Sequence, residues 1–519
     1  MELNSLQHLT TLSVTPRNVI PENFVLSKNM TEYHIHICDC EYPSFPSRLR
    51  HPASRTICFI PTEETIRTKV VARNAKIRSV KIEECQNLQD VFQLDGVEDA
   101  KKDCLSHLTT LELKYMDALI CIWKGPTHHV NLRSLASLTL WVCGSLKSVI
   151  SPSLAYSLER LEKLDIESCG QLEHIISEKD EDGKETFSKT HSQQACLQNL
   201  KEVQIEDCKK LEYVLPMSIA QGLLYLEVLK ISDAAQLMQV FGNEDGNIFS
   251  YPTELELRDS SKVGYLFSRN CAVVLPSLRH VEIHKCPQLL MHSVVRIPRK
   301  VSTNSEQLRV ADTESISLEI LDLEGCSQLE CIISKEDDYD IENEEISLNT
   351  PFLPVCFTSL KKIQIVDCNN LKMLLPITVA RGLPHLTELH IQASSQLVAI
   401  FGSEDQADIN NIEEIVLPEL LKLHLEQLPS LISFCPKEYH LVFPSLEMLR
   451  VKTCPEMTTS FSAAMDAYVH AKSEALTRDT AIGSATTQII VAPHSNGSDW
   501  IRLEGKWMSK EKAEERRRI

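Results

Sequence analysis

Residues 200–215 read LKEVQIEDCKKLEYVL, and residues 360–375 read LKKIQIVDCNNLKMLL. The two stretches place aliphatic residues at the same positions, and each has a cysteine at its ninth position. Both follow the frame L-x-x-L-x-L-x-x-C-x-x-L-x-x-V/I. A frame that returns at distant points of a chain indicates a structural repeat, and repeats have to be found before the chain is divided into domains.

Further copies of this frame occur along most of the chain, and several neighbouring copies lie 26 residues apart. Copies that keep the frame begin at positions 135, 161, 200, 226, 278, 318, 360, 386, 420 and 446. Looser copies begin at positions 77, 108 and 252. Together they predict a repeat region of about 13 units over residues 77–457. The units that begin at residue 161 resemble those that begin at residue 318, which indicates a duplication of about five repeats.

The spacing within one copy predicts its local structure. Alternate residues of the x-L-x-L-x segment point to opposite sides, which predicts a short strand with one apolar side. After it, apolar residues three apart suit a turn or a helical segment that brings the chain back. One unit cannot bury its apolar edge alone, but stacked units can. The sequence therefore predicts an α/β leucine-rich-repeat solenoid, with a curved parallel sheet on its inner face and helical or irregular return segments outside.

The frame weakens at both ends and is interrupted by acidic insertions. We expect irregular or degenerate repeats over residues 1–76, and a non-repeat cap with a basic tail over residues 458–519. Within that cap, SFSAAMDAYVHAKSEAL at residues 460–476 predicts a helix. Longer units carry SEKDEDGKE from Ser177 and SKEDDYDIENEE from Ser334. The first includes a D-x-D-G fragment, but it lacks the spacing and the closing Glu of an EF-hand loop, which favours a solvated acidic loop.

Cysteine recurs at the ninth position of the frame. There the chain turns inward at the end of the strand, and a small, weakly hydrogen-bonding thiol suits a stacked interior. The start of the chain lacks a secretory signal, so we expect a cytoplasmic protein with reduced thiols, and a disulfide framework is the rival interpretation. The cysteines at this position are Cys85, Cys143, Cys169, Cys208, Cys286, Cys326, Cys368 and Cys454.

Composition and motifs exclude several classes of function. The net charge of −19 argues against a nucleic-acid binder. No apolar run is long enough to span a membrane. The chain has no G-x-x-x-x-G-K-[ST], H-E-x-x-H, G-x-S-x-G or paired C-x-x-C motif. We therefore expect no enzyme, no catalytic residue and no cofactor.

One short segment, YHIHICDC at residues 33–40, contains residue types that bind zinc. On a strand these side chains would share one face, but a spacing of about 7 Å between alternate residues does not readily close a tetrahedron. The alternative is a repeat-like strand whose inward side is formed by Tyr33, Ile35 and Ile37. We therefore predict no metal site. The residues concerned are His34, His36, Cys38 and Cys40.

The outward side of the strands is the candidate binding surface. In six consecutive units, nine of the 18 outward residues are acidic and three are Lys or Arg. Such a face would attract a basic protein surface or peptide, although it is also the ordinary polar face of a repeat protein. Trp141 is a candidate aromatic anchor, and two histidines beside Glu282 form a conceivable pH-sensitive spot. The candidate binding residues are Trp141, Lys163, Asp165, Glu167, Glu202, Gln204, Glu206, Glu254, Glu256, Arg258, His280, Glu282 and His284.

Three longer stretches resemble a known family. LEKLDIESCGQLEHII at residues 161–176 and LKEVQIEDCKKLEYVLPMSIAQGLLYLEVLKISDAAQLMQVFG at residues 200–242 are similar to the C-terminal leucine-rich repeats of plant nucleotide-binding disease-resistance proteins of the coiled-coil class. LTTLSVTPRNVIPENFVLSKNMTEYHIHICD at residues 9–39 resembles the segment that precedes those repeats. The resemblance covers about residues 9–457.

The resemblance implies a role in recognition. The partner would be a pathogen effector, a guarded host protein, or the nucleotide-binding switch domain that such repeats hold inactive. The sequence contains none of the motifs of that switch, so ATP hydrolysis is not carried over. We expect a protein-recognition module of an intracellular immune receptor, and the alternative is a stand-alone repeat adaptor or decoy.

Overall fold

The computed structural model contains two compact units, residues 1–275 and 276–519. It describes residues 78–83, 88–93, 105–125, 127, 130–177, 197–220, 222–242, 253–264, 278–290, 317–330, 332–334, 357–380, 382–402, 413–436 and 439–458. Short strands are also described at residues 13–14, 34–35, 56–59, 295–296, 460–463, 488–491, 500–503 and 506–509.

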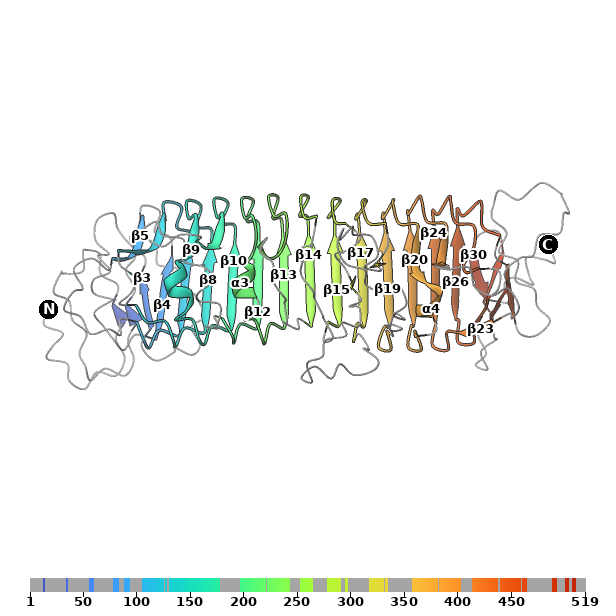
Figure 1. The fold of residues 1–519 in the computed structure, drawn as a ribbon, viewed down its shortest axis with the longest axis horizontal. Coiled ribbons are helices and arrows are strands. Elements are labelled where there is room, and N and C mark those ends of the chain that lie inside the picture. Colours follow the sequence, from blue (N-terminus) through green and yellow to red (C-terminus); the bar gives the residue numbers. More distant parts are fainter. Residues whose placement is uncertain are drawn as a thin grey trace, which may run out of the picture. The chain divides into compact units, whose positions relative to one another are not determined.

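Unit 1 is built on a parallel sheet in which each strand pairs in register with the next one along the chain. Figure 1 shows these strands side by side. They are β3 (Thr56–Phe59), β4 (Ser79–Glu83), β6 (Thr110–Lys114), β8 (Ser137–Trp141), β10 (Lys163–Glu167), β12 (Glu202–Glu206), β13 (Val228–Ser232) and β14 (Glu254–Arg258).

Unit 2 continues the same design. Its strands also pair in parallel and in register with their neighbours in the chain. They are β15 (His280–His284), β17 (Ile320–Glu324), β19 (Lys362–Val366), β21 (Glu388–Gln392), β24 (Lys422–Glu426) and β26 (Met448–Lys452). From β4 onward, every strand of the two series begins two residues after a predicted repeat start, which confirms the leucine-rich-repeat fold.

Alternating burial explains why these segments are strands. In β10, Leu164 and Ile166 are buried, while Lys163, Asp165 and Glu167 are partly exposed on the other side. Adjacent repeats place their buried leucines and isoleucines in rows, because the pairing is in register. Each row excludes water only when a neighbouring repeat covers it, so the repeats stabilise one another.

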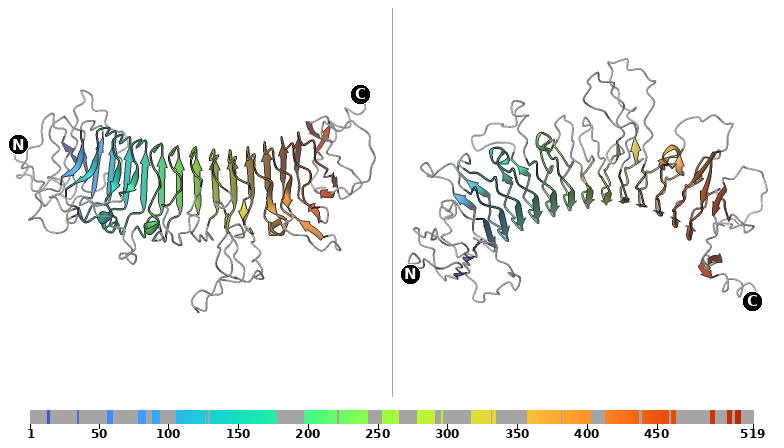
Figure 2. Two further views of the ribbon diagram at one scale, coloured as in Figure 1. Left: turned by 45° about the horizontal axis from the view of Figure 1, so that its top comes forward. Right: turned by 90° about the horizontal axis from the view of Figure 1, so that it is seen from below.

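The return segments lie on the side of each unit opposite the exposed strand face (Figure 2). The predicted helical or irregular character of these segments is confirmed, with few helical residues among those that the structure describes. The described helices, α2 (Pro152–Ala155), α3 (Met217–Ala220) and α4 (Ile377–Ala380), have four residues each. The other regular elements on this side are short parallel strand pairs. These are β5 (Asp90–Gln93) with β7 (Cys121–Lys124), β9 (Ser148–Ile150) with β11 (His174–Ile176), β16 (Val295–Arg296) with β18 (Ile333–Ser334), and β20 (Met373–Pro376) with β22 (Ala399–Gly402). A four-stranded sheet is formed by β23 (Glu413–Val416), β25 (Tyr439–Phe443), β28 (Gln488–Val491) and β27 (Ser460–Ala463), in that order.

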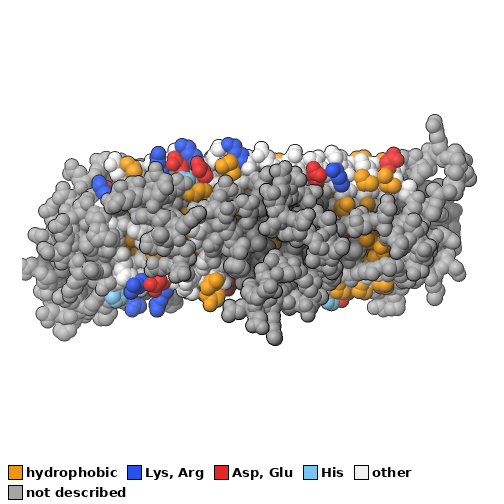
Figure 3. Space-filling model, in the orientation of Figure 1, with side chains coloured by type: hydrophobic (Ala, Val, Ile, Leu, Met, Phe, Trp, Pro, Cys, Tyr) orange, Lys and Arg blue, Asp and Glu red, His pale blue; other side chains and the backbone are white. Residues whose placement is uncertain are grey.

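Aromatic residues fill the space between the strand side and the return side. In unit 1, Phe92 stacks on Trp123 with ring centroids 4.8 Å apart. In unit 2, Phe434 lies between Phe401 and Phe443, at 5.7 Å and 5.6 Å. On the face in Figure 3, the charged side chains of the described residues lie mainly along the edges, with hydrophobic side chains between them.

The predicted helix over residues 460–476 is wrong at its start. Its first four residues form β27 (Ser460–Ala463), which pairs in parallel with β28 (Gln488–Val491). Phe461 between two serines follows the polar and apolar alternation of a strand. The remainder of the predicted helix lies outside the described residues. The other short pairs are β1 (Ser13–Val14) with β2 (His34–Ile35), and β29 (Trp500–Leu503) with β30 (Lys506–Ser509).

The cysteine position marks a sharp bend after each strand. The residue before it has a positive φ in every described repeat from β6 onward, for example 52° at Asp207 and 54° at Asp367. The cysteine thiol then donates to the carbonyl oxygen two residues back, at 3.4–3.9 Å. Ser260 and Ser394 make the same bond in repeats without a cysteine.

The seven described cysteines at this position are buried and unbridged, as predicted. Cys85 lies outside the described residues. A hydrogen bond with the thiol of Cys169, together with burial, raises the pKa of Cys143 and of Cys208 above the usual value. A buried thiol with a raised pKa is chemically inert, so Cys143 and Cys208 have a structural role.

Candidate functional site

The candidate binding residues lie where the sequence predicted, on the exposed side of the sheet. In unit 1 the last residues of successive strands form one row, Lys114, Trp141, Glu167, Glu206, Ser232 and Arg258. The middle residues form a second row beside it, which includes Asp165 and Gln204. In-register pairing thus brings side chains 26–39 residues apart in the sequence into direct contact, as for Lys230 with Glu256 and Lys163 with Glu202.

Salt bridges neutralise much of the acidic excess on this face. Lys163 lies 2.9 Å from Glu202 of the next strand, and the Gln204 amide donates to the same carboxylate at 2.6 Å. Half-exposed pairs of this kind contribute little to stability, about 0–1 kcal/mol. The positive charge of Lys163 nevertheless compensates the charge of Glu202, so Glu202 adds little to the net negative charge that a partner would meet.

A second group of pairs joins β13 and β14. Lys230 lies 2.8 Å from Glu254 and 3.3 Å from Glu256, and Arg258 lies 2.7 Å from Glu256. The hydrogen bond to Glu254 raises the pKa of Lys230, so this lysine stays charged at neutral pH. Lys230 and Arg258 therefore link the predicted binding residues Glu254 and Glu256 in one ion-pair network.

A third group, on β4 and β6, was missed by the sequence analysis. Lys81 lies 2.9 Å from Glu112, and Lys114 lies 2.5 Å from the same carboxylate. Burial acts to raise the pKa of Glu112, but hydrogen bonds from Lys114 and Lys81 outweigh it, and the pKa is lowered. The alternation of buried and exposed residues on β4 and β6 could have revealed these residues. They were missed because their repeats follow the frame more loosely.

Trp141 stands beside these pairs with an aromatic neighbour. The Lys114 ammonium lies 4.9 Å from the centre of its ring. Tyr115, which is 40% exposed, packs against it with ring centroids 5.4 Å apart. The two rings form a partly exposed aromatic surface at the end of β6 and β8, a type of surface that is common at the centres of protein interfaces.

Three carboxylates on β10 and β12 have no salt bridge within the described part of the chain: Asp165, Glu167, which is the register partner of Trp141, and Glu206. Burial raises the pKa of Asp165, and the Lys163 charge offsets this only in part. Burial and the nearby Glu206 charge raise the pKa of Glu167, despite its hydrogen bond with Trp141. These three side chains carry the uncompensated negative charge of this strand face.

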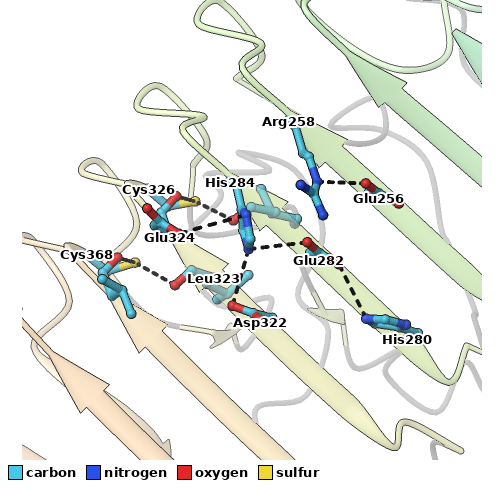
Figure 4. A network of polar contacts seen from close by, with 12 residues as sticks. Glu256, Arg258, His280, Glu282, His284, Asp322, Leu323, Glu324, Cys326 and Cys368 are labelled. Carbon is cyan, nitrogen blue, oxygen red and sulfur yellow. Dashed lines mark hydrogen bonds and ion pairs between the residues drawn. The ribbon is translucent and has the colours of Figure 1, made fainter. Parts of the chain in front are cut away.

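In unit 2, Figure 4 shows His284 between carboxylates from two neighbouring strands. Its Nε2 atom lies 3.3 Å from Asp322 and 3.6 Å from Glu282, and its Nδ1 atom lies 3.9 Å from Glu324. His280 approaches the other oxygen of Glu282 at 3.7 Å. The His284 ring is therefore surrounded by three carboxylates of its own sheet.

A different pair of histidines on unit 2 was missed by the sequence analysis. His390 of β21 and His424 of β24 are register partners, and their ring centroids lie 5.5 Å apart. The Nε2 atom of His424 lies 3.0 Å from the Sδ atom of Met448 on β26. Burial lowers the pKa of His424, and the neighbouring His390 and Arg450 charges lower it further.

No group of three or more His, Cys, Asp or Glu side chains among the described residues is arranged to hold a metal ion. No helix in the same part of the chain has the length and apolar character needed to cross a membrane. The side chains of the His34, His36, Cys38 and Cys40 segment, and the acidic insertion after Ser177, lie outside the described residues.

Comparison with known proteins agrees with the repeat architecture. The family described as "Plant disease resistance protein RPS2-like, leucine-rich repeats" matches residues 62–170, 184–235, 236–392 and 337–470, most of the chain. The "Probable disease resistance protein At1g12290" of Arabidopsis thaliana is 31% identical over 175 residues. That alignment covers 33% of this chain and 17% of the relative, so the chain matches only a small part of the relative's length.

Proposed function

Because the chain belongs to the leucine-rich-repeat family of RPS2-like plant disease resistance proteins, we propose that it is the protein-recognition module of an intracellular disease-resistance receptor. In this role it senses a pathogen effector, or the host protein that an effector modifies, in the cytoplasm. The partner is a protein, and the chain carries out no chemistry on it.

The exposed strand face is the observation that supports this role. The buried residues of each strand repeat from unit to unit, whereas the outward residues change from Lys–Asp–Glu in β10 to Glu–Gln–Glu in β12 and Val–Lys–Ser in β13. A fixed frame thus presents a different set of polar groups on each repeat. Extended surfaces of this kind are what repeat proteins use to bind other proteins.

Within unit 1 we place the partner contact at Trp141, Tyr115 and the three carboxylates Asp165, Glu167 and Glu206. The lysines and arginines on strands β4 to β14 of this unit are already paired with carboxylates. The three uncompensated carboxylates therefore favour a partner that presents lysine or arginine. The aromatic pair supplies apolar area that gains from being covered.

The experiment compares two variants of the chain in a binding assay. Partners are recovered by proximity labelling in infected leaf tissue, and each is then tested for binding to the purified chain. The first variant combines Asp165→Asn, Glu167→Gln and Glu206→Gln. The matched control neutralises the same number of exposed carboxylates off the strand face, as Glu159→Gln, Glu212→Gln and Glu227→Gln.

We expect the strand-face variant to lose at least about tenfold in affinity, or about 1.4 kcal/mol, while the control variant binds like the parent chain. Equal binding by the parent and both variants would overturn the proposed contact. Recovery of host and pathogen proteins at no more than the background of an unrelated repeat protein would overturn the recognition role itself.

A further inference from the structure

Three side chains near the end of the unit 2 sheet combine two imidazoles with one thioether. His390, His424 and Met448 lie on β21, β24 and β26, which are consecutive strands of the sheet. The two histidines are paired in register, with their rings edge to face. Met448 is 42% exposed, so an ion from solvent can reach the cluster.

The closest contact in this cluster joins two potential metal ligands. The Nε2 atom of His424 lies 3.0 Å from the Sδ atom of Met448. Thioether sulfur and imidazole nitrogen are ligands for soft transition-metal ions such as Cu(I), whereas Mg²⁺ and Ca²⁺ require oxygen ligands. We propose that His390, His424 and Met448 form a binding site for a soft monovalent metal ion of the Cu(I) class, independently of the proposed recognition role.

The geometry is close to what such an ion needs. With bond lengths of about 2.0 Å to nitrogen and about 2.3 Å to sulfur, as in zinc sites, two ligand atoms at a tetrahedral angle lie about 3.5 Å apart. The His424–Met448 pair therefore has to open by about half an ångström, which the three rotatable bonds of methionine permit. In the proposed site the third ligand is His390 of the neighbouring strand, whose ring centroid lies 5.5 Å from that of His424.

The positive side chains nearest the cluster are paired with carboxylates, although the Arg450 charge still lowers the pKa of His424. Lys422 lies 2.5 Å from Glu388, while Arg450 and Lys452 lie 3.2 Å and 3.0 Å from Glu426. Each nearby positive side chain is thus paired. The lowered pKa of His424 keeps its ring neutral at neutral pH, and the neutral imidazole is the form that binds a metal.

A bound ion would connect three successive repeats across the exposed face of the sheet. Because the ion binds the folded arrangement and not the unfolded chain, it would stabilise this end of unit 2. The site differs from the cysteine ladder, whose thiols are buried on the other side of the strands.

The test uses Ag(I), a redox-inert probe of Cu(I) chemistry, on the full chain. Accessible thiols are first blocked with iodoacetamide, and the protein carries ¹³C-methyl methionine for NMR. The Met448 methyl resonance is assigned by its absence in Met448→Leu. We expect Ag(I) to shift this resonance to saturation with one ion bound, while the Met457 methyl resonance stays in place. Zn²⁺ at the same concentration should leave the Met448 resonance unchanged.

Variants distinguish a built site from a lone thioether. His424→Gln and His390→Gln should each weaken the Ag(I) response of the Met448 methyl group by at least about tenfold. The matched control His385→Gln, which removes a half-exposed histidine paired with Glu419, should leave it unchanged. An unmoved Met448 resonance, or the parent response in both His424→Gln and His390→Gln, would overturn the proposal.

Discussion

At the scale of single residues, the bend after each strand shows how the fold imposes a backbone conformation on unrelated side chains. The residue before the cysteine position has a positive φ whether it is Val142, Asp207, Lys285 or Thr453. A β-branched residue such as valine rarely adopts this conformation. The repeat geometry therefore outweighs a cost of about 1–2 kcal/mol per residue.

Among the described repeats, the repeat of β17 is the one with a glycine, Gly325, at this position. Its φ is 66°, and an added Cβ atom would lie 3.2 Å from the Cα atom of Lys285 in the preceding repeat. We expect Gly325→Ala to lower the free energy of unfolding by about 1–2 kcal/mol, measured by urea denaturation. Gly170→Ala is the matched control, since its added methyl would have no heavy atom within 4 Å. Equal stability of the two variants would contradict this account.

Asp165 carries a prediction about pH. Its pKa is raised, mainly by burial, so the folded state holds the proton more tightly than the unfolded state. The contribution of Asp165 to stability is therefore highest below the ordinary aspartate pKa of about 4, and this contribution falls as pH rises from there through the raised folded pKa. We expect Asp165→Asn to raise the melting temperature at pH 7 and to lose this advantage at acidic pH. A variant that is less stable than the parent at pH 7 would show that the charged form is favoured.

The sequence predicts some of these residue-scale features and not others. The outward positions and the buried cysteines follow from the frame, because period-two alternation decides the side of the strand on which each residue lies. The salt bridges that close the Lys230 network do not follow, since they depend on rotamers of long side chains from separate repeats. Four aspartates precede the cysteine position: Asp207, Asp233, Asp259 and Asp367. They could have predicted the bend, because aspartate is enriched at positive φ.

At the scale of elements, strands could be predicted far better than return segments. Each strand is fixed by two buried aliphatic residues in a constant frame. The return segments vary in length and hold apolar residues three apart, a spacing that serves a helical turn and a short buried strand alike. The pairing of β9 with β11 depends on adjacent repeats meeting in space, which local sequence does not encode.

Ile205 tests how far one repeat depends on its neighbours. It is 2% exposed and pairs in register with Ile166 and Ile231 on either side. Ile205→Asp would bury an unpaired charge, and we expect a loss on the order of 4 kcal/mol or more. Hydrogen exchange should show lost protection in β10 and β13 as well as in β12. Ile205→Val should cost only about 0.5–1.5 kcal/mol, and loss of protection confined to β12 would show that the repeats are independent.

At the scale of the whole molecule, the net charge of −19 is a poor guide to what a partner meets. On the strand face of unit 1, most carboxylates are engaged by lysine or arginine, and the uncompensated charge is concentrated at Asp165, Glu167 and Glu206. Reversing Glu202, Glu254 or Glu256 would break internal salt bridges, which would mix stability effects with binding effects. The three uncompensated carboxylates are therefore the cleaner target.

The response of binding to salt follows from this arrangement. If a basic partner surface meets these carboxylates, the association rate should fall as ionic strength rises, because the screening length shrinks from about 10 Å at 0.1 M to about 3 Å at 1 M. The dissociation rate should change less, since it depends on the apolar contact at Trp141 and Tyr115. Biolayer interferometry at several salt concentrations measures both rates.

Two variants locate the charge that is responsible. In the Asp165→Asn, Glu167→Gln, Glu206→Gln variant, the dependence of the association rate on ionic strength should flatten. The Glu159→Gln, Glu212→Gln, Glu227→Gln control should keep most of this dependence. A dependence that is the same in both variants would mean that the partner is steered by the overall charge of the chain and not by this part of the strand face.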